Sequence, residues 1–97
     1  MIEMKVKGIA LDPSNLQTVV ILKDGEERKY LPIWVGHTEA TAIAFALEGT
    51  RPPRPMTHDL MRSIVEQCKI KVDKVLISEL KEGTFYAEMT VEAVEAI

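Results

Sequence analysis

The segment from Leu31 to Leu60 most constrains the fold, because its local chemistry changes several times over a short length. It begins as an apolar strand, turns at Gly36, becomes a helix poor in charge, and crosses a proline-arginine stretch before a second helix. Both histidines and the only tryptophan lie inside it. The sequence on either side alternates between apolar and polar residues, as half-buried strands do. The pattern predicts β-hairpins on which the central segment packs.

The N-terminal residues predict two strands with one irregularity. Apolar and polar residues alternate from Ile2 to Lys7, and the apolar set resumes at Ile9 after Gly8. An interruption of this kind at a glycine predicts a β-bulge or a bend. Residues 12–15 have the composition of a turn, and a second strand is expected over residues 16–22.

The next turn is expected at Asp24-Gly25, because the favoured two-residue hairpin turn needs positive φ at both central positions. A third strand follows over residues 27–35. Pro32 cannot donate a ladder hydrogen bond, so we expect this strand to lie at a sheet edge or to be distorted at this residue. One face of the strand comprises Leu31, Ile33 and Val35.

Two helices are expected in the middle of the chain. The first covers residues 38–48, is closed by Gly49, and is apolar nearly all round. We therefore expect it to contact a sheet on one side and a second protomer on the other, which gives a homodimer. The second helix has Thr57 as its N-cap. Its expected buried face comprises Leu60, Met61, Ile64, Val65 and Cys68, with the cysteine as inert core.

The C-terminal part predicts a hairpin, with a strand over residues 72–80, a loop over 81–84 and a strand over 85–92. The tail to Ile97 has no stop signal, as expected of a chain cut inside a larger fold. The complete order is β-β-β-α-α-β-β. This order predicts a single α+β domain over residues 1–97, with two helices packed on a largely antiparallel sheet.

Composition limits the classes of function. No apolar run approaches the roughly 20 residues that cross a bilayer, so we expect no membrane partner. A single cysteine cannot form an internal disulfide, which favours a cytoplasmic location. The net charge of −3 gives no global attraction to nucleic acid, so binding would need a local basic patch. The phosphate-binding glycine fingerprints are absent from the sequence.

The sharpest local constellation is Thr57-His58-Asp59. An imidazole is a common acid-base group and metal ligand, so His58 together with the Asp59 carboxylate could perform acid-base chemistry or bind a metal. The alternative is a capped helix start, in which Asp59 interacts with the helix dipole and His58 is merely exposed.

His37 and Glu39 flank the start of the first helix. If the two helix starts meet, these two side chains and the His58–Asp59 pair converge. Such mixed nitrogen and oxygen ligands suit Mn or Zn better than Mg. Alternatively, Glu39 is a plain capping partner.

Arg51 and Arg54 flank two prolines in a stretch expected to adopt polyproline II, which has three residues per turn. Both side chains then project from one side and, with Arg62, form a candidate phosphate-binding patch. The alternative is that these arginines pair with carboxylates. The aromatic residues Trp34, Phe45, Phe85 and Tyr86 are interpreted mostly as packing residues rather than as base-stacking groups.

Several runs carry a resemblance to a known family. They are residues 31–36, Glu39-Ala40, residues 54–60, residues 73–75 and residues 83–87. In this order and spacing they resemble the bifunctional nuclease domain family. The family's domain continues past the end of this chain with another helix that carries a Ser-Asp-Ala-Ile-like sequence. We therefore expect this chain to be a C-terminally short member.

The resemblance implies a small dimeric nuclease that hydrolyses phosphodiester bonds of DNA and/or RNA, with a divalent metal as a candidate cofactor. From residue chemistry and motif position, the expected catalytic residues are His58, Asp59 and Glu39. Arg51 and Arg54 are the expected phosphate-binding residues, and Asp59, Glu39 and His37 the candidate metal ligands. The alternative is a non-enzymatic dimeric regulatory or interaction module. A third reading is the binding of a small anion at the helix starts.

Overall fold

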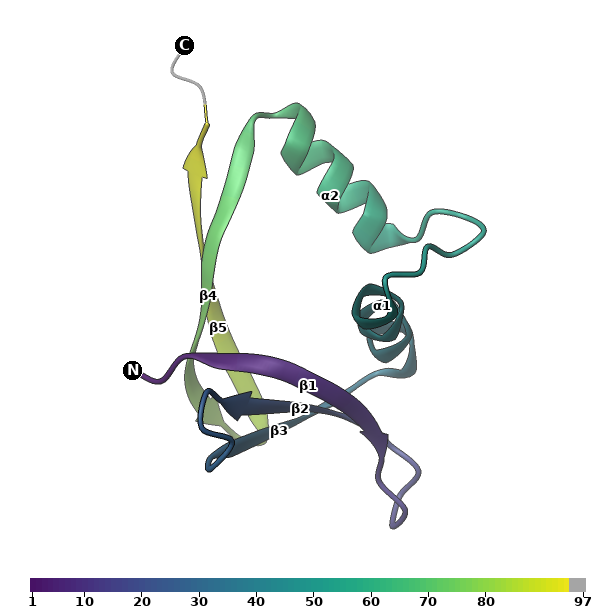
Figure 1. Cartoon of the computed structure of the whole chain (residues 1–97), viewed down its shortest axis with the longest axis vertical. Coiled ribbons are helices and arrows are strands. Elements are labelled where there is room, and N and C mark those ends of the chain that lie inside the picture. The colour runs from purple at the N-terminus through teal and green to yellow at the C-terminus, as the bar shows by residue number, and fades with distance from the viewer. Residues whose placement is uncertain (95–97) are drawn as a thin grey trace. The chain divides into compact units, whose positions relative to one another are not determined.

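The computed structural model describes residues 1–94, which lie in two compact units that divide after Arg54 (Figure 1). The first unit contains β1 (Met4–Leu11), β2 (Thr18–Asp24), β3 (Tyr30–Val35) and α1 (His37–Glu48). The second contains α2 (Thr57–Gln67), β4 (Ile70–Lys81) and β5 (Thr84–Ala93).

The α+β class and the predicted element order are confirmed, and every strand pairing is antiparallel. The strands form two sheets, β1-β2-β3 and β4-β5, where the sequence suggested one. The sequence also predicted a single domain over residues 1–97. That prediction depends on how the two units join, so it stays a prediction. The expectation of an open chain end falls partly on residues 95–97, outside the described residues.

The predicted β-bulge lies in β1. Val6 pairs with Leu22 and Ile9 pairs with Val20, and the register shifts between Val6 and Gly8. Successive side chains on a strand point to opposite faces, so an odd spacing would place Val6 and Ile9 on opposite faces. The extra residue of the bulge restores the phase, and both side chains face the same side.

The turn between β2 and β3 differs from the prediction. It is a five-residue loop over 25–29, and its left-handed residue is Glu27 (φ 56°) rather than Gly25. The Asp24 carboxylate accepts hydrogen bonds from the backbone N–H groups of Arg28 (2.9 Å) and Lys29 (3.3 Å). Because this carboxylate satisfies the loop backbone, a wider turn is stable and β3 begins later than expected.

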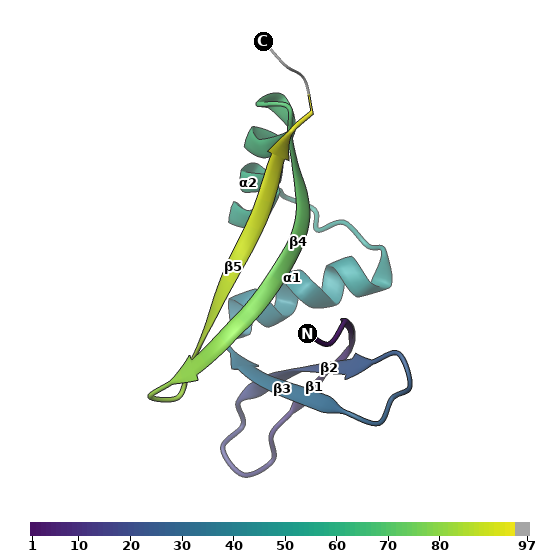
Figure 2. The ribbon, with the colours of Figure 1, turned by 90° about the vertical axis from the view of Figure 1, so that its left-hand side faces the viewer.

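The two faces of the β1-β2-β3 sheet differ in burial. Along the edge strand β3, residues alternate between exposed and partly buried. The partly buried set is the predicted inner face, Leu31, Ile33 and Val35, and the exposed set is Tyr30, Pro32 and Trp34. Helix α1 contacts β1 and β2 (Figure 2). Within the described residues, the buried hydrophobic core is Val19, Val20 and Ala40.

Helix α1 ends as predicted. Gly49 adopts a left-handed conformation (φ 68°), and its N–H donates to the carbonyl of Ala46 (3.3 Å). The N–H of Thr50 donates to the carbonyl of Phe45 (3.0 Å). Only a residue tolerant of positive φ can end a helix in this way. The helix starts at His37, one residue earlier than predicted.

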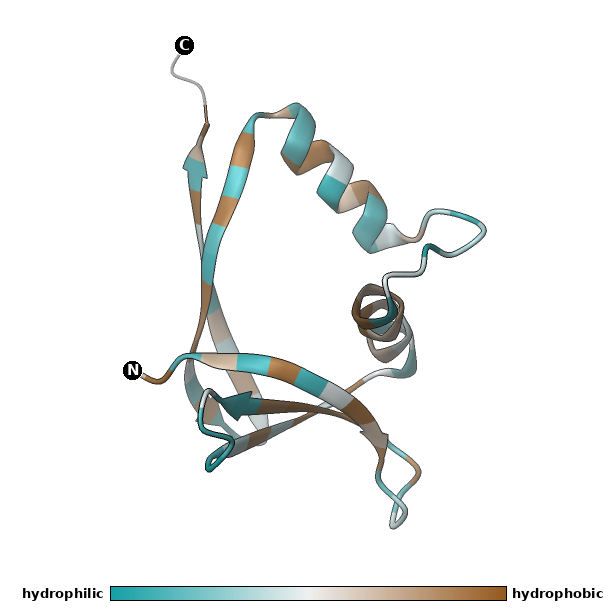
Figure 3. Ribbon diagram, in the orientation of Figure 1, coloured by the Kyte–Doolittle hydropathy of each residue, from teal (hydrophilic) through white to brown (hydrophobic). Residues whose placement is uncertain are grey.

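In the second unit, α2 contacts β4, but its predicted buried face is wrong. Leu60 is 60% exposed and Ile64 is 54% exposed, and α2 contains no buried residue. Cys68 follows the helix and is exposed, so it is not core. Figure 3 shows the contrast between α1, which is apolar along most of its length, and α2, which alternates. A lone helix on a two-stranded hairpin cannot enclose an apolar side chain on all sides.

The β4–β5 hairpin turns at Glu82 and Gly83, which lie inside the loop predicted over residues 81–84. Both residues have positive φ, 48° and 77°. The two-residue turn that was expected at Asp24-Gly25 therefore occurs here instead. Neither helix of the described chain is long and apolar enough to cross a membrane.

Candidate functional site

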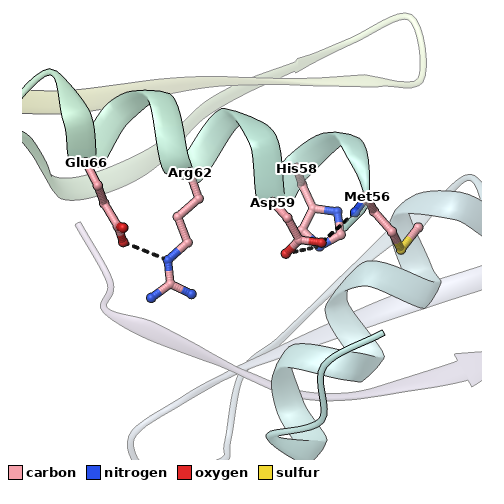
Figure 4. Close-up of polar contacts among 5 residues, drawn as sticks. All are labelled: Met56, His58, Asp59, Arg62 and Glu66. Carbon is pink, nitrogen blue, oxygen red and sulfur yellow. Dashed lines mark hydrogen bonds and ion pairs between the residues drawn. The ribbon is translucent and has the colours of Figure 1, made fainter. Parts of the chain in front are cut away.

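His58 and Asp59 occupy the second and third positions of α2 (Figure 4). The Oδ2 atom of Asp59 accepts a hydrogen bond of 2.7 Å from the backbone N–H of Met56. Met56, rather than the predicted Thr57, is the N-cap residue. An acidic residue at the third helical position can reach back to the N–H of the residue before the helix, and this interaction sets the start of α2.

The other carboxylate oxygen of Asp59 faces the imidazole. Nε2 of His58 lies 3.5 Å from Oδ1 of Asp59, and the two side chains are 45% and 35% exposed. A protonated His58 forms an ion pair in this arrangement. An imidazole and a carboxylate this close together can act in acid-base chemistry.

Arg62 lies one turn further along α2 and is engaged by its own helix. Its Nε donates to Oε1 of Glu66 at 3.0 Å (Figure 4). This is the spacing at which opposite charges on a helix meet. The alternative for the arginines, pairing with a carboxylate, therefore holds for Arg62.

Glu39 occupies the third position of α1, as Asp59 does in α2. Its carboxylate oxygen Oε2 lies so close to Gly36 that a Cβ on this residue would collide with it. Gly36 precedes the helix, and its carbonyl accepts from the N–H of Ala40 at 3.0 Å. Both candidate carboxylates thus fold back over the start of their own helix.

The predicted set of four divides into two pairs. His37 and Glu39 belong to the first unit, and His58 and Asp59 belong to the second. Their convergence stays a prediction. Within each unit, over residues 1–94, no three His, Cys, Asp or Glu side chains are grouped so that they could hold a metal ion. The side chains of a single unit therefore do not fit the metal that the sequence suggested.

Arg51 and Arg54 are exposed, and neither forms an ion pair within the described part of the chain. The chain bends at Pro53 and Arg54. A bend interrupts the straight three-residue repeat of polyproline II, so the geometric reason for placing both guanidinium groups on one side is lost.

Trp34 was interpreted as a packing residue, yet it is 50% exposed. It lines an open depression of about 450 Å³ in the first unit. Other lining residues are Leu11, Leu16, Gln17, Thr18 and His37. The sequence itself indicated this exposure. Trp34 alternates with Leu31, Ile33 and Val35 along the strand, so its side chain belongs to the opposite face of the sheet.

The indole of Trp34 is fixed by Asp12. Its Nε1–H donates to Oδ2 of Asp12 at 3.1 Å, while Oδ1 accepts from the hydroxyl (2.7 Å) and the N–H (3.0 Å) of Ser14. These bonds favour the ionised carboxylate, and they hold the pKa of Asp12 below its ordinary value of 3.8, with Ser14 as the larger cause.

Comparison with known proteins identifies the family. The sequence model of the bifunctional nuclease domain matches residues 20–97. Two relatives from Mycobacterium tuberculosis are similar to this chain: "Uncharacterized protein MT1877" of strain CDC 1551 / Oshkosh and "Uncharacterized protein Rv1829" of strain ATCC 25618 / H37Rv. Each is 43% identical over 87 residues, which are 90% of this chain and 53% of the relative. The chain thus spans about half the length of these relatives. By its match to the family's sequence model, the chain belongs to the bifunctional nuclease domain family.

Proposed function

We propose that this chain is a nuclease module that hydrolyses phosphodiester bonds of DNA, RNA or both. The observation that carries the proposal is the family match over residues 20–97. The His58–Asp59 pair supports it, since an imidazole and a carboxylate lie 3.5 Å apart on a partly exposed helix start. The family match does not identify catalytic residues, so the residue roles proposed below follow from side-chain chemistry.

In the proposed reaction, His58 accepts a proton from the attacking water as its oxygen bonds to phosphorus. The bond from phosphorus to the leaving oxygen breaks, that oxygen takes up a proton from solvent, and His58 then releases its proton to solvent. Asp59 favours the protonated imidazole that forms on the way. The roles of Glu39 in orienting water and of Arg51 and Arg54 in binding phosphate oxygens stay predictions, because these residues belong to the first unit.

A divalent metal with Asp59, Glu39 and His37 as ligands remains a proposal without a step assigned to it. The single units do not provide three grouped ligands in the described residues. In addition, Asp59 already accepts a hydrogen bond from the Met56 N–H.

The test is cleavage of single-stranded and double-stranded DNA and RNA by purified wild type, His58→Ala and Asp59→Ala. We expect loss of at least tenfold in both variants, because a positioned acid-base group contributes about 10²–10⁴-fold. Thr57→Ala, in the same helical turn, is the matched control. Equal cleavage by all preparations would identify a contaminating enzyme. A parallel reaction with a chelator tests the metal.

The second candidate is a non-enzymatic regulatory or interaction module that dimerises through α1. It is favoured by the use of Asp59 to bond its own helix start at Met56, which this candidate requires. The apolar α1, with Leu47 exposed, supplies the surface for a second protomer. Sedimentation of wild type and Leu47→Glu tests the dimer, and the cleavage assay on the same two proteins separates the module from the nuclease. A dimer lost in the variant, without cleavage by either protein, favours the module.

A further inference from the structure

The exposed face of the β1-β2-β3 sheet carries an aromatic platform beside two lysines. Trp34 lies opposite Val19, and four residues away on the same face of β3 Tyr30 lies opposite Lys23. Lys23 is in turn opposite Lys5 of β1. Neither family membership nor the catalytic proposal assigns a role to these residues.

The indole extends across the central strand. Asp12 directly follows β1, whereas Trp34 is on β3, and strands two places apart in a sheet are about 10 Å apart. The hydrogen bond of 3.1 Å between these side chains therefore requires the indole to extend across β2. Val19, which lies opposite Trp34 on the same face of β2, is only 8% exposed. Trp34 is 50% exposed, so about half of its surface is open to a ligand.

Asp12 also makes this ring rigid. Its carboxylate is itself held by two hydrogen bonds from Ser14, so the indole is fixed before any ligand arrives. An aromatic side chain ordered in advance binds a planar ring with a smaller loss of conformational entropy. A phosphate would be repelled by Asp12, so the group that fits here is an uncharged ring.

The other end of the face is cationic. Lys5 and Lys23 are directly opposite each other on adjacent strands, and like charges in this position destabilise a sheet. Neither lysine forms an ion pair among residues 1–94, and the Lys23 ammonium lies over the Tyr30 ring at 4.9 Å. An anion between the two lysines would relieve their repulsion. The strand spacing places this end about 13 Å from the indole.

From these observations we infer that this face binds single-stranded nucleic acid, with an unpaired base stacked on Trp34 and a backbone phosphate at Lys5 and Lys23. The inference rests on the proposed function, because it names the form of nucleic acid that the nuclease takes. Unpaired bases expose their ring faces, whereas bases in a duplex are stacked on one another.

The lone tryptophan makes the test direct. Trp34 is the only tryptophan, so all indole fluorescence reports on this platform. Short single-stranded and duplex oligonucleotides are titrated into the full chain under conditions in which they remain intact. We expect the single strand to quench the emission and the duplex to leave it unchanged. With a labelled oligonucleotide, Trp34→Leu lowers affinity about tenfold, as loss of one stacked base does.

Tyr86→Leu is the matched control, since this aromatic is 48% exposed and belongs to the second unit. Lys5→Gln and Lys23→Gln each reduce the slope of log affinity against log salt by about 0.7, and Lys71→Gln does not. Circular dichroism verifies folding, and the lysine variants keep the test valid if Trp34→Leu unfolds. Equal quenching by the duplex, unchanged binding by Trp34→Leu, or an equal loss in Tyr86→Leu overturns the inference.

Binding and cleavage are measured separately, so the two proposals fail in different ways. Quenching by single strands without cleavage of any substrate supports this face and contradicts the nuclease. Cleavage that depends on His58, combined with unchanged binding in Trp34→Leu, does the reverse.

Discussion

The carboxylate of Asp59 accepts a hydrogen bond of 2.7 Å from the backbone N–H of Met56, and this bond marks the start of α2. Asp59 is thus both a candidate catalytic residue and a residue that stabilises the start of its own helix. A loss of activity on its removal is informative only if the stability of the helix is measured alongside.

Asp59→Ala should lower the free energy of unfolding by about 1 kcal/mol, the usual effect of losing a helix cap. Thr57→Ala should change it by less than about 0.5 kcal/mol, because the N-cap residue is Met56 and not Thr57. Urea unfolding followed by circular dichroism measures both. A larger loss in Thr57→Ala would restore Thr57 as the cap.

Asp12 should stabilise the first unit in a pH-dependent way. Its pKa lies below 3.8 in the folded chain, so its contribution is fully present above that pH and is lost as the pH falls through the lower, folded-state value. In a carboxyl NMR titration, Ser14→Ala should raise the pKa of Asp12 more than Trp34→Phe does, because Ser14 is the larger cause. Ser63→Ala, in the second unit, should leave it unchanged. The reverse order for Ser14 and Trp34 would contradict the geometry.

Glu82→Asn should stabilise the β4–β5 hairpin by about 0.5 kcal/mol. Glu82 has a φ of 48°, which a non-glycine side chain disfavours and asparagine tolerates best. Asn-Gly is also the preferred pair for this turn. Gly83→Ala should act in the opposite direction, since φ is 77° there. Denaturation curves of both variants check the sign, and a destabilised Glu82→Asn chain would disprove the turn assignment.

Arg51→Gln with Arg54→Gln should weaken binding to single-stranded nucleic acid and reduce its salt dependence. Two lost phosphate contacts at about 0.7 each lower the log–log slope by about 1.4. Arg62→Gln is the control, because Arg62 is already paired with Glu66 at 3.0 Å. The test is to measure the affinity of each variant over a series of salt concentrations. If Arg62→Gln changed the slope as much as the double variant does, the effect would reflect general loss of positive charge and would contradict specific phosphate contacts of Arg51 and Arg54.

Most local structure follows from the order of residues. The bulge before Ile9, the edge position of Pro32, the helix end at Gly49 and the hairpin at Gly83 each follow from a steric or hydrogen-bonding property of one residue. The loop after Asp24 was not predictable in the same way. A carboxylate that bonds N–H groups four and five residues further on can override the local turn preference.

The candidate site was only partly predictable. The pairing of His58 with Asp59 follows from their adjacency at a helix start, whereas the choice of Met56 as the cap depends on which rotamer Asp59 adopts. The platform at Trp34 was missed because an aromatic residue in an apolar strand was interpreted as core, although its alternation with Leu31, Ile33 and Val35 put it on the other face.

The sequence by itself determined the strand and helix order, the antiparallel hairpins and the family, because these depend on periodicity, on individual turn residues and on motif spacing. Only the tertiary structure decided that Trp34 lies across β2 on Asp12, that the strands divide into two sheets and that the apolar face of α2 is exposed. The physical reason is that hydrogen bonds and burial between residues distant in sequence depend on which surfaces meet, and periodicity does not specify this.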